Sequence, residues 1–301
     1  MITYYKKKIG EREFKILPYF EIGSWINVIN PSEEEIDLLC KKFKLDKRNL
    51  FSGLDENEIP RLDFIKDNVY IFTKTILPNR TLQTFLIVIG KKFILTLSKE
   101  KPYAVEKILK GRVEFFTTQK LKSLIRILFL INEQLEKVIR QTVKEVQVKR
   151  KKEVELTENE LRDLLEKEDF LNNLVSSYHY LSLLYERIIK RIKFFEQDKE
   201  MIKDLIEEID EGFNLCKSSL KTISNIRDHY VVILSNRLNR AITILTVFTI
   251  LIDLPAAISG IYGMNLILPL QENHLAFWYI MSIIGFTWIA FVFYLKRKKI
   301  I

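Results

Sequence analysis

Two long apolar runs lie near the C-terminus of this 301-residue chain. Residues 241–262 contain one charged side chain, Asp253, and residues 275–295 contain none. A helix needs about 20 apolar residues to cross the hydrocarbon core of a bilayer. The alternative, two buried helices of a soluble core, is disfavoured because soluble cores seldom place two such runs back to back. The pattern therefore predicts two transmembrane helices joined by a short loop.

Basic residues flank this pair of runs. Arg237 and Arg240 precede the first run, and residues 296–299 are all Lys or Arg, whereas the connection 263–274 contains neither. Because positively charged flanks stay on the cytoplasmic side, we expect both ends of the hairpin in the cytoplasm. The chain is thus predicted to be a multi-pass protein of the cytoplasmic (plasma) membrane, in contact with the lipid bilayer.

One face of the first run is polar or small. At intervals of seven residues it carries Asn239, Thr246, Asp253 and Gly260, with a second row formed by Ile242, Thr249, Ala256 and Gly263. A packing seam of small residues would produce part of this pattern. An ionised carboxylate costs about 3 kcal/mol at the bilayer centre unless it faces protein or water. The carboxylate therefore favours a pore lining over a seam.

Pro255 lies two residues beyond Asp253. It cannot donate a hydrogen bond to the carbonyl of Leu251, so we expect the helix to be weakened or kinked there. A freed carbonyl at membrane depth needs protein or water as a partner. This argument also favours water along the polar stripe.

The first 115 residues alternate between strand-like and helix-like segments. Residues 25–29 (Trp-Ile-Asn-Val-Ile) predict a buried strand, and Ser32 with Glu35 has the spacing of a capping box that opens a helix. Residues 69–77 and 84–97 are rich in β-branched and aromatic residues and predict adjacent antiparallel strands. The breaks are expected at Pro78-Asn79 and Gly90-Lys91-Lys92. We predict a small α/β domain.

This domain has no catalytic signature. It has no glycine-rich phosphate loop, no Ser or Cys elbow and no HExxH motif, and the chain's three histidines are far apart in sequence. A sensor or scaffold domain is favoured over an enzyme.

The middle of the chain predicts long helices. Pro255 is the only proline between Thr118 and Tyr262. Thr157 and Glu160 form a second capping box. The expected helices cover residues 118–152, 157–196 and from about 200 into the membrane. At 1.5 Å per residue, residues 202–262 would span about 92 Å. We expect a stalk that is continuous with the first transmembrane helix.

Composition and charge exclude several other classes. The 35 aromatic residues exclude a disordered chain, and two cysteines exclude a disulfide scaffold. The first residues have no apolar run, so no secretory signal peptide is expected. The formal net charge is +9, but basic residues alternate with acidic ones along the helices, without interleaved aromatics. Nucleic acid is therefore not an expected partner.

The tetrapeptide Tyr262-Gly263-Met264-Asn265 ends the first apolar run. In that position it resembles the signature of the CorA magnesium transporter family, within the 2-TM-GxN superfamily. The acidic, proline-containing segment 54–61 is also similar to one in that family's amino-terminal domain. The resemblance implies an α+β membrane protein with an N-terminal cytoplasmic α/β domain, a long helical stalk and two C-terminal transmembrane helices.

The resemblance further implies a homopentameric channel for divalent cations, chiefly Mg²⁺, with Co²⁺ and Ni²⁺ as further candidates. The first spans would line the pore, and Tyr262, Gly263, Met264 and Asn265 would form its selective outer mouth. The Asn265 carboxamide would meet a hydrated cation. A second cation site at Asp253 is predicted from its place on the polar stripe and not from the resemblance. The expected pore-lining residues are Asn239, Ile242, Leu245, Thr246, Thr249, Asp253, Ala256 and Gly260.

Two features depart from the family pattern. Relatives often have a bulky hydrophobic residue at the position of Asp253, so the gate is expected at Ile242 or Leu245. Regulatory Mg²⁺ in the family lies between subunits, and Asp204 and Glu207 match the stalk acids by their distance from the signature. The hairpin tip expected to face them, residues 78–82, contains no acid.

The predicted organisation comprises six segments. They are a cytoplasmic α/β domain (1–115), a long-helix stalk (116–236), a pore-lining span (237–262), an outer loop (263–274), a second span (275–295) and a basic tail (296–301).

Two other functions stay open: a Zn²⁺ transporter of the same superfamily and a membrane-anchored coiled-coil scaffold. An enzyme is not expected.

Overall fold

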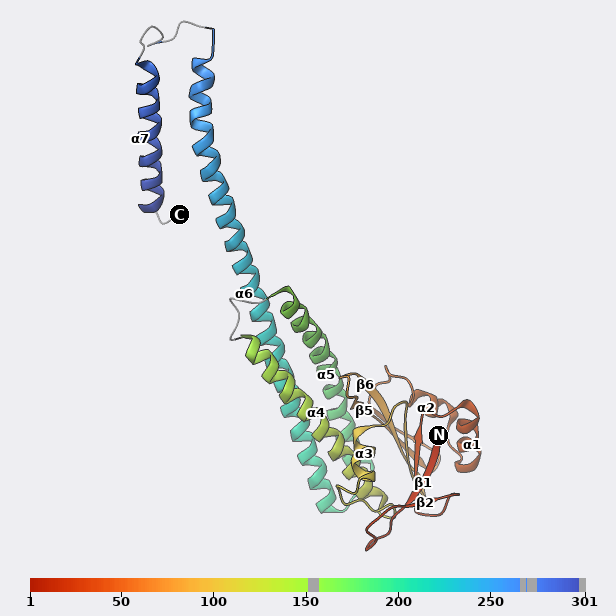
Figure 1. Cartoon of the computed structure of the whole chain (residues 1–301). Coiled ribbons are helices and arrows are strands. Elements are labelled where there is room, and N and C mark those ends of the chain that lie inside the picture. The colour runs from red at the N-terminus through yellow and green to blue at the C-terminus, as the bar shows by residue number, and fades with distance from the viewer. Residues whose placement is uncertain (151–156, 266–268, 270–274, 298–301) are drawn as a thin grey trace. The chain divides into compact units, whose positions relative to one another are not determined.

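The computed structural model describes residues 1–150, 157–265, 269 and 275–297. The chain divides into two compact units, unit 1 (Met1–Ile226) and unit 2 (Arg227–Ile301). Helix α6 (Glu196–Tyr262) contributes residues to both (Figure 1).

A seven-stranded sheet forms the centre of the α/β part of unit 1. Its strands are β1 (Ile2–Lys6), β2 (Lys15–Leu17), β3 (Trp25–Ile29), β4 (Arg61–Ile65), β5 (Asn68–Ile76), β6 (Leu82–Ile89) and β7 (Ile94–Ser98). The spatial order is β2-β1-β3-β7-β6-β5-β4. Strands β3 and β7 pair in parallel, and all other neighbours are antiparallel. The strand predicted at 25–29 and the antiparallel pairing of the following segments are thus confirmed.

Helix α1 (Glu33–Phe43) begins where the sequence predicts. The Ser32 hydroxyl accepts a hydrogen bond from the Glu35 amide at 3.2 Å, and the Glu35 carboxylate accepts one from the Ser32 amide at 3.1 Å. With α2 (Lys47–Ser52), this helix covers one face of the sheet (Figure 1). Ile36 and Leu39 of α1 join sheet residues such as Tyr70 in one hydrophobic core.

The other face of the sheet is also covered. Strands β5, β6 and β7 are buried almost throughout, as expected for strands packed on both sides. Helices α3 (Tyr103–Leu109) and α4 (Lys120–Arg150) lie on this second face. Two consecutive buried hydrogen bonds lie on this face. The Trp25 indole donates to the Thr96 hydroxyl at 2.8 Å, and this hydroxyl donates to the Asn27 side chain at 3.0 Å.

Helices α4, α5 (Glu158–Arg191) and the first part of α6 pack together in unit 1. The predicted capping box of Thr157 and Glu160 is present at the start of α5. Buried positions on α6 alternate at spacings of four and three: 198, 202, 205, 209, 212, 216, 219, 223 and 226. A Cβ on Gly212 would lie 2.8 Å from the Tyr178 ring, so this glycine lets α5 and α6 approach closely.

A buried polar contact links the three helices. The Tyr185 hydroxyl of α5 donates to the Asn132 side chain of α4 at 3.1 Å, and the Asn132 amide donates to the Leu205 carbonyl of α6 at 3.2 Å. Buried polar groups are costly without partners, so this network favours one relative register of the helices.

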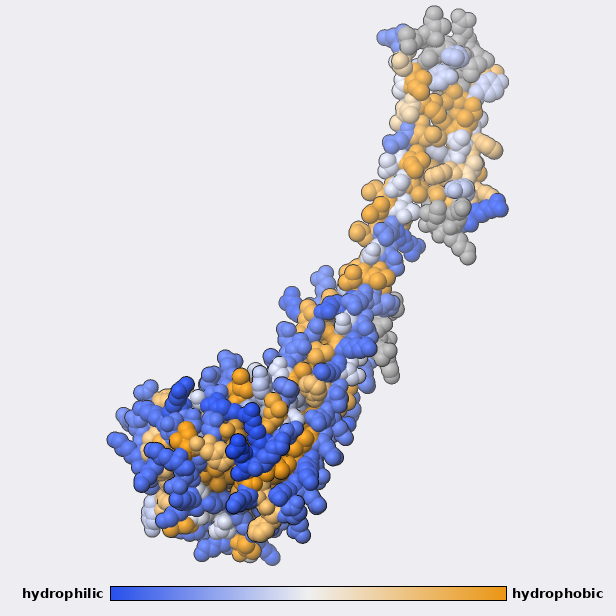
Figure 2. All heavy atoms as spheres, turned by 180° about the vertical axis from the view of Figure 1, so that it is seen from behind, coloured by the Kyte–Doolittle hydropathy of each residue, from blue (hydrophilic) through white to orange (hydrophobic). Residues whose placement is uncertain are grey.

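Unit 2 contains the last part of α6 and α7 (Ala276–Arg297), which lie side by side (Figure 1). Both are long and apolar enough to cross a membrane. Most of their apolar side chains are exposed; Phe286, for example, is 74% exposed (Figure 2). A pair of soluble core helices would be mostly buried, so this exposure favours the membrane interpretation.

Candidate functional site

The last part of α6 has one covered face. Wholly or partly buried residues recur three or four positions apart, at Thr243, Val247, Leu251, Pro255 and Ile258. Since successive helical residues are about 100° apart, these residues share one side. On α7, Ile284 and Leu295 are also buried. The two helices of unit 2 therefore pack through this side of α6.

The polar stripe lies on the opposite side of α6. The predicted pore-lining residues are all exposed in the single chain: Asn239, Ile242, Leu245, Thr246, Thr249, Asp253, Ala256 and Gly260. The alternative of a small-residue seam is therefore wrong for the contact between α6 and α7 of one chain. The stripe is free to face water or further copies of the helix.

Asp253 is exposed on this stripe. Within the described residues it has no ion pair or hydrogen bond, and the basic residues of α7 are Lys296 and Arg297, at the far end of that helix. An unpaired carboxylate in lipid is unfavourable by about 3 kcal/mol. Its surroundings in a membrane must therefore supply water, a cation or another protein chain.

Two threonines extend the oxygen-bearing surface of the stripe. The Thr246 hydroxyl donates to the Ile242 carbonyl at 2.8 Å, and the Thr249 hydroxyl donates to the Leu245 carbonyl at 3.0 Å. Each hydroxyl proton is thereby used within the helix, and each oxygen keeps lone pairs as acceptors. The water shell of a hydrated cation presents donors, so these oxygens suit it.

Pro255 does not interrupt the helix, because α6 continues to Tyr262. Pro255 and Leu251 both lie on the side that packs against α7. The carbonyl freed by the proline therefore belongs to the covered face and not to the polar stripe. The expectation that this carbonyl supports a wet stripe is wrong, because its position around the helix differs from that of Asp253.

The predicted outer mouth begins where α6 ends. The Gly263 amide donates to the Ser259 carbonyl at 2.9 Å, and the Met264 amide to the Ile261 carbonyl at 3.2 Å. Gly263 does not adopt a positive φ. A Cβ there would lie 3.2 Å from the Ser259 oxygen, so a close backbone approach, and not a left-handed turn, favours glycine.

Asn265 is exposed, and its carboxamide has no hydrogen bond within the described residues. The Tyr262 hydroxyl lies 3.4 Å from the Pro269 carbonyl, across the first part of the loop. Residues 266–268 and 270–274 of the predicted outer loop, and 298–301 of the basic tail, lie outside the described residues.

The two predicted stalk acids, Asp204 and Glu207, are exposed one turn apart on α6. They lie away from the side that carries Ile202, Leu205 and Ile209, which packs in unit 1. Among the described residues no group of three or more His, Cys, Asp or Glu could hold a metal ion. Mg²⁺ prefers near-octahedral oxygen coordination, which the two carboxylates of Asp204 and Glu207 do not complete by themselves.

The hairpin tip between β5 and β6 pairs with the chain's own helices. The Arg80 guanidinium donates to both carboxylate oxygens of Glu145 on α4, at 3.0 and 2.7 Å. Lys167 of α5 lies 3.3 Å from the same carboxylate and also pairs with Asp163. The tip lacks an acid, as its sequence shows, but the Arg80–Glu145 pair could not be predicted because no sequence pattern connects residues so far apart.

This pair should make the hairpin's docking depend on pH. The hydrogen bonds from Arg80 lower the pKa of Glu145 to about 2, from an ordinary value of 4.5. Because the pKa of Glu145 is lower in the folded chain than in the unfolded chain, the ionised carboxylate stabilises the fold above pH 4.5. This stabilisation is lost as the pH falls towards 2. We expect Arg80→Gln to reduce stability by about 1–2 kcal/mol at pH 7 and by much less near pH 3. Thermal unfolding of the detergent-solubilised chain at both pH values measures the difference. Arg112→Gln, at an exposed arginine, is the matched control, and an equal loss at both pH values would contradict the role of Glu145.

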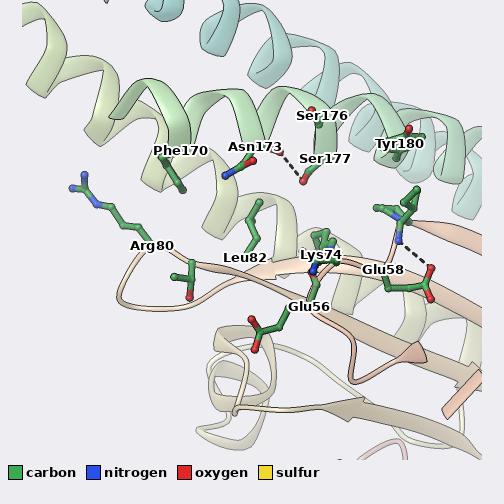
Figure 3. A pocket seen from close by; sticks show the side chains of 14 residues that line it. Glu56, Glu58, Lys74, Arg80, Leu82, Phe170, Asn173, Ser176, Ser177 and Tyr180 are labelled. Atoms are coloured by element: carbon green, nitrogen blue, oxygen red, sulfur yellow. Dashed lines mark hydrogen bonds between the residues drawn. The ribbon is translucent and has the colours of Figure 1, made fainter. Parts of the chain in front are cut away.

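The acidic segment that resembles the family pattern lies beside this hairpin. A cavity of about 490 Å³ separates it from α5 (Figure 3). Glu58 pairs with Arg61, Glu56 pairs with Lys99, and the buried Lys74 ammonium donates to the Glu56 carbonyl and to Thr84. Burial lowers the pKa of Lys74. These acids are engaged in structural contacts of their own chain.

Known proteins resemble this chain in sequence and in fold. The family model for the CorA-like Mg²⁺ transporter protein matches residues 21–297. The cobalt/magnesium transport protein CorA of Methanocaldococcus jannaschii is 27% identical over 291 residues, which cover 91% of this chain and 90% of that protein.

Two solved structures have the same fold over nearly the whole chain. The complete structure of the CorA magnesium transporter from Methanocaldococcus jannaschii matches with a TM-score of 0.85 at 23% identity, over 99% of this chain and 98% of that one. The full-length CmaX protein matches with a TM-score of 0.74 at 14% identity, over 99% of this chain and 96% of that one. Because the family model spans most of its length, the chain belongs to the CorA-like Mg²⁺ transporter protein family.

Proposed function

We propose that this chain is the protomer of a homopentameric channel that moves Mg²⁺ across the cytoplasmic membrane into the cell. The observation that carries the proposal is the polar stripe of α6, which is exposed on the side opposite to α7. Five such stripes turned inward would enclose a water-filled path, with α7 outside. The carboxylate of Asp253 would then avoid lipid.

The proposed selectivity follows from the chemistry of Mg²⁺. This ion gives up its hydration shell reluctantly and prefers oxygen ligands. A ring of five neutral Asn265 carboxamides would hydrogen-bond the water shell without binding the ion tightly. Conduction requires binding that is favourable enough for entry and weak enough for release. Co²⁺ and Ni²⁺ are further candidate cargoes because their hydrated ions are of similar size.

The gate is proposed at Ile242 or Leu245. Both are large, apolar and exposed, at 53% and 67%. Rings of such side chains on the pore side would form a hydrophobic constriction that closes by excluding water.

Asp204 and Glu207 are proposed as contributors to a regulatory Mg²⁺ site only together with oxygen ligands from a neighbouring subunit.

Flux into liposomes tests this function. The purified full-length chain would be reconstituted with an entrapped cation-sensitive dye, and Mg²⁺, Co²⁺, Ni²⁺ and Zn²⁺ would be compared. We expect saturable Mg²⁺ entry that is driven by an inside-negative potential. Entry of Zn²⁺ in preference to Mg²⁺ would assign the chain to the zinc transporter alternative. No flux of any cation would favour the membrane-anchored scaffold.

The oligomeric state is a separate prediction. A single polar stripe cannot enclose a path, whereas five copies can place their Asp253 residues around one axis. We expect native mass spectrometry in a mild detergent to show a pentamer of the 301-residue chain. A monomer or a dimer as the largest species would contradict the pore.

A further inference from the structure

A basic cleft lies at one end of the sheet in unit 1, and none of its residues belongs to the proposed ion pathway. Its volume is about 660 Å³. The end of α1, the β4–β5 turn, the β6–β7 turn and the connection before β3 all contribute to its walls. The cleft contains five lysines and one carboxylate: Lys42, Lys44, Lys66, Lys91, Lys92 and Asp67.

Most of this positive charge is not neutralised by the protein. Asp67 pairs with Lys91 at 2.9 Å, and the Lys42 ammonium lies 5.1 Å from the centroid of the Tyr4 ring. The other three lysines have no ion-pair partner in the part of the chain that the structure describes. Like charges held in one cleft repel, and an anion bound between them would relieve that repulsion.

The wall of the cleft is aromatic. Phe20 packs edge-to-face against Phe43 and Phe93, with ring centroids 4.9 and 6.3 Å apart. Phe43 and Phe93 are buried, whereas Phe20 is half-buried and borders the open space. A planar ring of a ligand could pack against Phe20 while its anionic part reaches the lysines.

The backbone is strained at two of the three unpaired lysines. Lys44 caps the end of α1 with φ of 54°, and Lys66 lies in the β4–β5 turn with φ of 55°. This left-handed region favours glycine or asparagine, because a Cβ clashes with the backbone there. Lysine nevertheless occupies both positions, and both side chains line the same cleft.

We propose that this cleft binds a nucleoside polyphosphate. Lys44, Lys66 and Lys92 bind the phosphate chain, and the base packs against Phe20. The limited volume of the cleft and its aromatic wall favour a small ligand over an extended nucleic acid. The site is separate from the polar stripe of α6 and is independent of the proposed ion transport.

Binding to the full-length chain in detergent tests this proposal. Isothermal titration in EDTA, without Mg²⁺, would compare ATP, tripolyphosphate and adenosine. We expect saturable ATP binding, tripolyphosphate affinity weaker by at least about tenfold and no adenosine binding. No saturable ATP binding would overturn the site. Equal affinity for tripolyphosphate would overturn the role of the aromatic wall, and equal affinity for adenosine would overturn the role of the lysines.

Three variants separate specific contacts from general charge. The double variant Lys44→Gly with Lys66→Gly removes two ammoniums and relieves both strained positions, so it should weaken ATP binding by at least about tenfold without lowering the melting temperature. Phe20→Leu should weaken ATP binding but not tripolyphosphate binding. Lys41→Gln, next to the cleft on α1 but not lining it, should change neither. Unchanged ATP affinity in the double variant, or equal weakening by Lys41→Gln, would overturn the assignment.

Discussion

Replacing Asn265 by alanine is expected to abolish selective Mg²⁺ uptake while the proposed pentamer still assembles. The change removes five carboxamides from the proposed mouth, which follows directly after α6. The Asn265 side chain makes no hydrogen bond within the described residues, so its loss should not disturb the fold of the chain. We expect the initial rate of Mg²⁺ entry into liposomes to fall by at least about tenfold, which corresponds to about 1.4 kcal/mol in the barrier.

Two measurements keep this prediction specific. Asn172→Ala, at an exposed asparagine of α5, should leave uptake unchanged. Cobalt(III) hexaammine, a fixed mimic of hydrated Mg²⁺, should block the parent protein. Normal uptake by Asn265→Ala, with normal block by this complex, would contradict the assignment of the mouth.

Asp253→Asn is expected to change divalent conductance. The substitution keeps the size of the side chain and removes five charges from the proposed pore. Five carboxylates around one axis would attract a divalent ion, and neutral carboxamides in their place would bind it more weakly.

The competing interpretation is that Asp253 serves assembly alone. It would require a basic partner, and α7 provides Lys296 and Arg297 only at its end. Mg²⁺ flux into liposomes, with native mass spectrometry on the same sample, separates the two. A pentamer with altered flux supports the pore. Loss of the pentamer, or unchanged flux, would refute the pore role. Ser218→Ala, at a polar α6 position within unit 1, is the matched control.

Local patterns in the sequence predicted much of the fold. The capping boxes at Ser32 and Thr157 were correct because they depend on hydrogen bonds between residues three positions apart. The strand at 25–29 and the two candidate spans were correct because composition and spacing within each segment determine them. The breaks at Pro78-Asn79 and Gly90-Lys91-Lys92 coincide with the turns that separate β5, β6 and β7.

The candidate site was only partly predictable. The heptad spacing of polar residues identified one face of α6, but spacing alone did not say which face α7 covers. The structure shows that α7 packs on the side of Val247 and Leu251, and this leaves the stripe exposed. The same packing corrects the interpretation of Pro255, whose freed carbonyl lies on the covered side.

What the sequence determined by itself is therefore the long helices, the strands in 25–29 and 69–97, the two apolar spans and the signature that ends the first span. Each depends on propensity, hydrogen bonding or hydrophobicity over a few neighbouring residues. Only the tertiary structure decided that Arg80 pairs with Glu145, 65 positions away, and that lysines from three separate segments meet in one cleft. Those contacts depend on strand order and helix packing, which bring together residues that no local pattern connects.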